Sequence, residues 1–205
     1  MLPLADIPLP AHLTPLQALV MSRPDHYLPW RELAPSRRHV TAPGGPFHPD
    51  MVDKPGAFPS MLIFRALLFE SPKILQKATS CYYADKADWE AFTASQPEGS
   101  KPTATEAQAA YFNICCYGQP CVQRRDGMRY IPEYFNYEER WETLLEAHNG
   151  GPIPFQSVLC WLRGQRPPGT PRRRGDQPLG KPPLCGPLTA YLLAADLTYT
   201  DKVAT

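Results

Sequence analysis

The stretch PFQSVLCWLRGQRPPGTPRRRGDQPLGKPPLCGPLTAYLLAADL, residues 154–197, places an apolar segment on either side of a basic loop. Both apolar segments have the spacing of one helical face. In the first segment the apolar residues are Phe155, Val158, Leu159 and Leu162, and in the second they are Leu188, Tyr191, Leu192 and Ala195. Pro187 stands where a first helical residue is expected. We therefore predict two helices whose apolar faces belong to the core.

The loop between the two segments is strongly basic and rich in proline and glycine. It has one acid, Asp176, and its cations are Arg163, Arg166, Arg172, Arg173, Arg174 and Lys181. Guanidinium groups suit phosphate because their planar fork donates two hydrogen bonds. Residues 163–181 are therefore a candidate site for nucleic acid or another anion, or a targeting or partner-binding motif. The alternative is a solvated loop, and without adjacent aromatic residues any nucleic-acid binding would be salt-sensitive and sequence-blind.

Length and composition indicate a mainly helical, bundle-like fold. The chain has 205 residues, a hydrophobic fraction of 43% and 26 prolines, twelve of which lie before residue 60. We expect a proline-rich N-terminal arm with one short helix over residues 1–59, packed on the body. Residues 60–205 would form a helical domain that carries the basic Pro/Gly-rich loop at 163–184.

Helix signals recur along the body, with a single signal for strands. Six or seven short helices are expected, several of them opened by a capping residue such as Ser71, Asp85, Thr103 or Asn136. The apolar run Met61–Phe69 is compatible with a buried helix or a strand. Asp126-Gly127 predicts a short β-hairpin between residues 121–125 and 128–131.

Two further basic clusters could extend an anion-binding surface. Arg124 and Arg125 lie with Arg129 across the predicted hairpin turn, and Arg37-Arg38 precede His39. Sequence does not show whether these clusters share a face with the basic loop. Scatter over the surface is the simpler interpretation.

Histidines and cysteines offer weak metal-site candidates. Cys116 and Cys121 have a tolerable zinc spacing, but no second pair follows, and His148 is distant. His48 and Asp50 with His148 would resemble a two-histidine, one-carboxylate iron site, although a proline-rich loop is a poor support for it. We predict neither a metal nor a cofactor, and we expect the six cysteines to be reduced.

The expected cellular location of the protein, and the expectation that it is not an enzyme, rest on features that the sequence lacks. No apolar run is long enough to span a membrane, and the first residues, MLPLAD, do not resemble a signal peptide. A cytoplasmic or nuclear location is therefore expected. The common nucleotide-binding and catalytic motifs are absent, which favours a non-enzymatic protein without excluding an enzyme.

Three functions remain at this stage. The first is a helical interaction module that binds a protein partner or itself, for which Trp30, Trp89, Trp141 and Trp161 are possible anchors. The second is a nucleic-acid-associated protein that contacts phosphates through residues 163–181. The third is a metal-dependent enzyme built on His48, Asp50 and His148. We favour the first because it demands least of residues that sequence cannot place.

Overall fold

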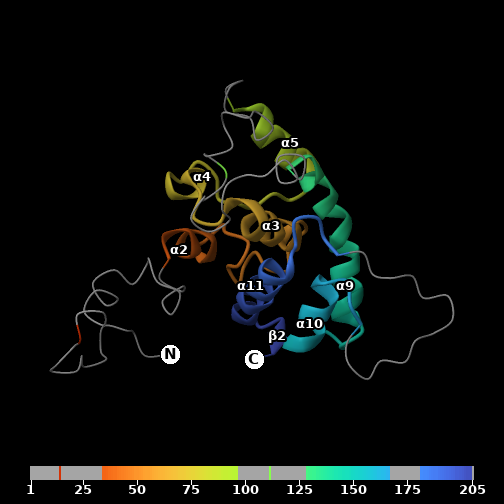
Figure 1. Cartoon of the computed structure of the whole chain (residues 1–205). Coiled ribbons are helices and arrows are strands. Elements are labelled where there is room, and N and C mark those ends of the chain that lie inside the picture. The colour runs from red at the N-terminus through yellow and green to blue at the C-terminus, as the bar shows by residue number, and fades with distance from the viewer. Residues whose placement is uncertain (1–13, 15–33, 97–110, 112–127, 167–180, 205) are drawn as a thin grey trace.

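The computed structural model of the chain describes residues 14, 34–96, 111, 128–166 and 181–204. Within these ranges the protein is mainly helical, which confirms the predicted fold class (Figure 1). The elements are α2 (Pro35–Thr41), α3 (Ala57–Ile63), the π-helical η4 (Phe64–Leu68), α4 (Pro72–Leu75), α5 (Lys86–Ala94), the 3-10 helix η7 (Met128–Tyr137), α9 (Glu138–Glu146), β1 (Ile153–Pro154), α10 (Phe155–Leu162), α11 (Pro187–Leu197), the 3-10 turn η8 (Thr198–Thr200) and β2 (Val203–Ala204).

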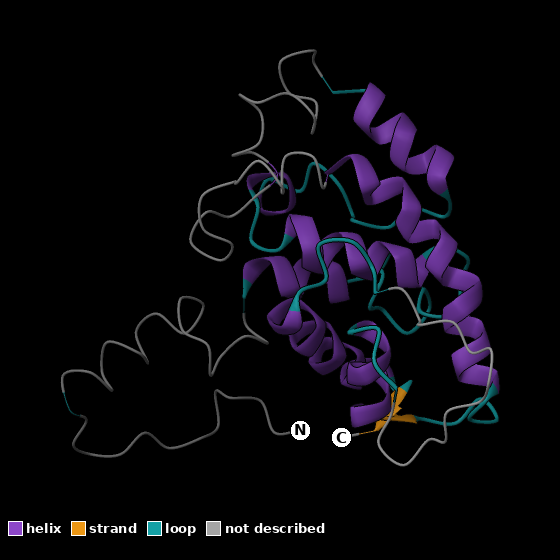
Figure 2. Cartoon of the chain, turned by 45° about the vertical axis from the view of Figure 1, so that its right-hand side comes forward, coloured by secondary structure: helices purple, strands orange, loops and turns teal. Residues whose placement is uncertain are grey.

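The centre of the fold is the apolar run Met61–Phe69, which is helical as far as Leu68. Its residues continue α3 directly into η4, and every residue of both elements is buried. A helix that is apolar on all sides must be covered on all sides. In agreement, α11 contacts η4, while η7 and α9 contact α3. Figures 1 and 2 show α9 along one flank and α5 at the far end from the C-terminus.

The segment before α3 is more regular than the sequence predicts. Within the segment predicted as a proline-rich arm, Pro35–Thr41 forms α2, with proline in its first turn. The Ser36 hydroxyl and amide both donate to Glu70 Oε1, at 2.6 and 3.1 Å, and tie α2 to the end of η4. Val40, Phe47 and Phe58 belong to one hydrophobic cluster with residues beyond 60. The division of the chain at residue 59 stays a prediction.

The predicted hairpin is wrong in the arm that the structure describes. Residues 128–131 lie in η7, and Ile131 and Tyr134 are fully buried three residues apart, as 3-10 periodicity requires. Among the described residues the sheet is instead a parallel pair of two-residue strands. It joins Ile153 to Val203 and Pro154 to Ala204, so it closes the end of the molecule that holds the C-terminus (Figure 2).

Local capping signals were partly right. Asp85 caps α5 by accepting from the Asp88 amide at 2.9 Å, and Ser71 caps α4 by accepting from the Ile74 amide. However, α4 has only four residues and ends at Leu75, and the positive φ of 55° at Lys77 keeps the chain from continuing as a helix. Asn136 does not cap α9, because η7 runs through it to Tyr137.

Two other predicted helices cannot be compared with the structure. The residues of the helix predicted after Thr14 lie outside the described residues, as does the capping box at Thr103. No helix in the part of the chain that the structure describes is long and apolar enough to cross a membrane.

Candidate functional site

Helix α11 carries apolar residues on two opposite sides, and only one side is used by the core. Gly186 is the extended residue before the helix, and Pro187 takes a first-turn position as predicted. The inner side, which is 0–1% exposed, consists of Ala190, Leu193, Ala194 and Leu197. This side packs toward η4 and α10. The helix is therefore already fixed to the body by its inner residues.

The outer side of α11 is the stripe that the sequence assigned to the core. Leu188 is 65% exposed and Tyr191 is 51% exposed, while Leu192 and Ala195 are half-buried. The prediction of the buried face was therefore wrong, although the helix itself was right. The physical reason is that α11 is apolar all round, so helical spacing alone fits either side equally well.

The neighbouring helix extends this exposed surface. The ring of Phe155, at the start of α10, meets the Tyr191 ring edge-on with centroids 5.8 Å apart. Phe155 is itself half-buried, and α10 packs against α11. We call Phe155, Leu188, Tyr191, Leu192 and Ala195 the outer face.

The outer face lies on helices that carry almost no charge. Residues 155–162 of α10 contain no Asp, Glu, Lys, Arg or His, and residues 187–197 of α11 contain only Asp196. Asp196 is 5% exposed and belongs to the inner side. By comparison, 20% of the whole chain is charged. Contact with water at the outer face is therefore made by apolar and neutral polar groups.

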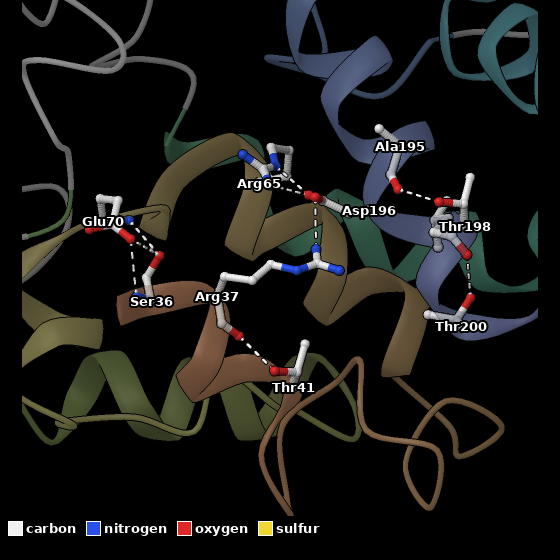
Figure 3. A network of polar contacts seen from close by, with 10 residues as sticks. Ser36, Arg37, Thr41, Arg65, Glu70, Ala195, Asp196, Thr198 and Thr200 are labelled. Carbon is white, nitrogen blue, oxygen red and sulfur yellow. Dashed lines mark hydrogen bonds and ion pairs between the residues drawn. The ribbon is translucent and has the colours of Figure 1, made fainter. Parts of the chain in front are cut away.

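Asp196 anchors α11 from behind through two buried arginines (Figure 3). Arg65 of η4 donates from Nε to Asp196 Oδ2 at 2.6 Å and also pairs with it through a terminal nitrogen. Arg37 of α2 lies 2.7 Å from Asp196 Oδ1. These three residues, called here the Arg–Asp–Arg cluster, are at most 5% exposed and join three elements far apart in sequence.

Aromatic rings complete the environment of this cluster. The Arg65 guanidinium lies 4.2 Å from the Phe69 ring centre, and the Arg37 guanidinium lies 4.4 Å from that of Tyr199. Cation–π contacts offset part of the excess of two cations over one anion. The cluster corrects the view of Arg37-Arg38-His39 as a surface group, because Arg37 is buried. Arg65 inside an apolar run was the one sequence signal for it.

The candidate anion site is described only at its two ends. Arg163 and Lys181 are exposed, and Arg166 is half-buried. The Tyr137 hydroxyl donates to the Lys181 carbonyl at 3.0 Å, and that of Tyr134 donates to the Pro183 carbonyl at 2.6 Å. Outside the described residues lie Arg124, Arg125, Arg172, Arg173 and Arg174. The structure therefore does not show whether the basic clusters share a face.

The metal candidates do not assemble among the described residues. No group of three His, Cys, Asp or Glu side chains within residues 34–96, 128–166 and 181–204 is placed to hold a metal ion. His48 Nδ1 instead lies 3.2 Å from the Asp50 amide, in a local turn, and His148 Nδ1 lies 2.9 Å from the Leu144 carbonyl. Cys116 and Cys121 are outside the described residues.

The described cysteines are free thiols in the interior. Cys81, Cys160 and Cys185 are buried. Burial raises the pKa of the Cys185 thiol to about 12, and it raises that of Cys81 as well. Such thiols stay protonated at neutral pH, so they are poor nucleophiles.

The described tryptophans stabilise the core. Trp89, Trp141 and Trp161 are 3–7% exposed. Trp141 stacks on Phe58 with centroids 4.6 Å apart, and Trp161 lies 6.0 Å from Trp141. These three possible anchors are therefore core residues, which was the alternative for them, and Trp30 lies outside the described residues. The exposed aromatic residue that sequence analysis placed in the core is Tyr191.

No protein-family model matches this chain, and no significant match was found among the curated proteins or the solved structures.

Proposed function

We propose that the protein is a non-enzymatic helical interaction module that binds a protein surface through the outer face of α11. The observation that carries the proposal is the pair of apolar sides on one helix. Leu188 and Tyr191 remain at least half exposed, while the opposite side already fills the core. Contiguous exposed apolar surface that the fold does not need is typical of binding sites.

The chemistry of the surface supports a protein partner over a charged one. The outer face contains an aromatic ring with a hydroxyl group, aliphatic side chains, and no charge. Tyrosine and apolar side chains are enriched at the centres of protein interfaces, and charged residues are depleted there.

The test is site-specific photo-crosslinking in cells. A photoreactive phenylalanine analogue replaces Tyr191 in one version of the chain and Leu75 in another. Leu75 is the matched control, because it is also apolar and 45% exposed but belongs to α4. We expect a discrete crosslinked product from position 191 that is absent from position 75.

A second substitution makes the result specific to the outer face. Adding Leu188→Glu to the Tyr191 probe version should abolish the product while leaving the melting temperature within about 2 °C, because Leu188 is 65% exposed. A product that survives Leu188→Glu, or equal products from positions 75 and 191, would contradict the proposal.

A further inference from the structure

The turn that ends α9 holds an asparagine–glycine pair that the proposed function does not use. Asn149 and Gly150 follow the helix, and both are exposed. We propose that Asn149 is a modification site, at which the asparagine is converted to aspartate and isoaspartate by spontaneous deamidation in the folded protein. The site is independent of the outer face, so it goes beyond the proposed function.

The reaction needs only the two residues and water. The backbone nitrogen of Gly150 loses its proton and attacks Cγ of Asn149. An N–Cγ bond forms, the Cγ–Nδ2 bond breaks, and ammonia leaves, so the intermediate is a succinimide ring. Water then opens this ring at either of its two carbonyl groups. One opening gives aspartate, and the other gives isoaspartate, in which the main chain runs through the former side chain.

Glycine after Asn149 leaves the attacking nitrogen unhindered. A side chain at the next position would obstruct the approach of this nitrogen to Cγ, and glycine permits close approach because it has none. The position that a Cβ atom would take at Gly150 has nothing within 4 Å, so the surrounding space is open as well. The chain turns sharply here, since φ is 54° at Asn149 and 70° at Gly150.

Asn136 provides a comparison within the same chain. It is also exposed, but it lies inside η7, and the residue after it is Tyr137. Helical backbone and a large neighbouring side chain therefore both oppose the attack at this position. Asn113 lies outside the described residues. Of the two asparagines that the structure describes, Asn149 is the one that combines exposure, a position outside a helix and a following glycine.

Opening of the turn controls the rate of the reaction. The Gly150 amide donates to the Leu145 carbonyl at 3.0 Å, and the Asn149 amide donates to the Glu146 carbonyl at 2.9 Å. The attacking nitrogen is therefore engaged while the turn is closed. The ends of elements open at a much lower free energy than the whole protein unfolds. Asn149 consequently reacts in the folded protein, but more slowly than in an unfolded chain.

The products disturb the turn that formed them. The new carboxylate lies at the C-terminal end of α9, where the helix dipole is negative and Glu142 and Glu146 are already exposed. Isoaspartate also lengthens the backbone ahead of β1, whose Ile153 pairs with Val203. Deamidation is therefore a slow, one-way loosening of the last turn of α9.

Peptide mapping by mass spectrometry on the full chain tests this site. The purified protein is held at physiological temperature and mildly alkaline pH, with and without urea. Without urea, the peptide with Asn149 should gain the mass difference between an amide and an acid, and the peptide with Asn136 should not. Isoaspartate should exceed aspartate, because direct hydrolysis of the side-chain amide gives aspartate alone. Urea should accelerate the conversion, because it opens the turn.

The variant Gly150→Ala tests the role of the glycine. It restores a side chain beside the attacking nitrogen and should slow the conversion several-fold. The comparison is made in urea, where the turn is open in both chains, so that strain at the positive φ of position 150 does not contribute. Equal rates for wild type and Gly150→Ala in urea would contradict the assigned mechanism.

Three other results would overturn the proposal. They are conversion of Asn149 only in urea, conversion of Asn149 no faster than that of Asn136 in the folded chain, and formation of aspartate without isoaspartate. Each of these readouts is separate from the crosslinking at Tyr191. Failure of the interaction module therefore leaves the modification site unaffected, and failure of the site leaves the module unaffected.

Discussion

At the scale of single residues, Asp196 has the largest expected effect on stability. It is the carboxylate between two buried guanidinium groups, with Arg65 Nε at 2.6 Å and Arg37 at 2.7 Å. Asp196→Asn should destabilise the protein by about 3–5 kcal/mol, because it leaves both buried cations without this anion. Urea unfolding followed by circular dichroism measures the change.

A triple substitution distinguishes charge from packing in the same cluster. Replacing all three members together, by Arg37→Met, Arg65→Met and Asp196→Leu, removes every buried charge. The triple variant should recover most of the loss, since apolar replacements of buried ion pairs are often neutral or stabilising. A loss below about 1 kcal/mol for Asp196→Asn alone would show that the aromatic rings, not the carboxylate, hold the two arginines.

Two glycines with similar backbone angles provide a second test at this scale. Gly56 has a φ of 78°, and a Cβ atom there would lie 2.1 Å from the Tyr83 carbonyl oxygen. Gly150 has a φ of 70° and open space around its Cβ position. Gly150→Ala should cost about 1 kcal/mol from backbone strain alone. Gly56→Ala should cost at least about 2 kcal/mol more, because rigid backbone must shift.

Thermal unfolding of the two glycine variants checks this difference. Equal losses at the two positions would mean that the segment around Tyr83 moves aside freely.

At the scale of elements, α9 is coupled to the start of α3 by one carboxylate. Glu138, the first residue of α9, accepts a hydrogen bond from the Gly56 amide. Burial raises the pKa of Glu138 above its ordinary value of 4.5, and the bond from Gly56 opposes this more weakly. The folded state therefore holds the Glu138 proton more tightly than the unfolded state.

The sign of the resulting pH dependence follows from linkage. The contribution of Glu138 is most favourable below pH 4.5 and falls as the pH rises from there through the raised pKa. Glu138→Gln keeps an oxygen acceptor for Gly56 but cannot ionise, so its stability relative to wild type should increase across that range. Denaturant titrations at several pH values measure the difference, and a decrease would show that the ionised bond to Gly56 dominates.

Structural features that depend on neighbouring residues in the sequence were predicted well. Features that depend on tertiary contacts were predicted poorly. Asp85 caps α5 as expected, because a cap needs only its own first turn. The buried side of α11 could not be predicted, because Tyr191 and Leu193 are both apolar and either could face the core. The choice between them depends on a tertiary contact, the ion pair of Asp196 with Arg65 of η4. The Asp126-Gly127 signal predicted a strand at Met128–Ile131 that η7 replaces, because burial of Ile131 and Tyr134 follows 3-10 spacing.

The candidate site was hidden from the sequence for the same reason. Leu188 and Tyr191 were identified as a stripe but assigned to the wrong environment, since sequence does not reveal which apolar side of a helix the rest of the chain covers. Conversely, Trp141 and Trp161 were considered as anchors but fill the interior around Phe58.

At the scale of the whole molecule, the nucleic-acid hypothesis stays a prediction with a direct test. Labelled single-stranded and duplex oligonucleotides are titrated at about 50 and 200 mM salt with wild type and with the triple variant Arg172→Ala, Arg173→Ala, Arg174→Ala. If residues 163–181 contact phosphates, binding should fall steeply with salt and weaken in the variant. Absence of binding at the lower salt would exclude this role for the loop.

Tyr191→Glu is the matched control for that measurement. It removes the proposed protein interface and leaves every arginine in place, so it should bind oligonucleotides as the wild type does. Loss of binding in this variant would show that nucleic-acid binding also depends on the outer face.

The pairing of Arg65 with Asp196 also has a consequence for synthesis on the ribosome. The two residues are 131 positions apart, so the ribosome must add another 131 residues after Arg65 before the carboxylate that pairs with it exists. At about 5–20 residues per second, this delay lasts roughly 7–26 s, and during it the side of η4 that α11 covers in the folded protein is still exposed. A nascent chain in that interval is a natural client for chaperones that hold apolar segments, and slowing translation between residues 65 and 196 should prolong their engagement.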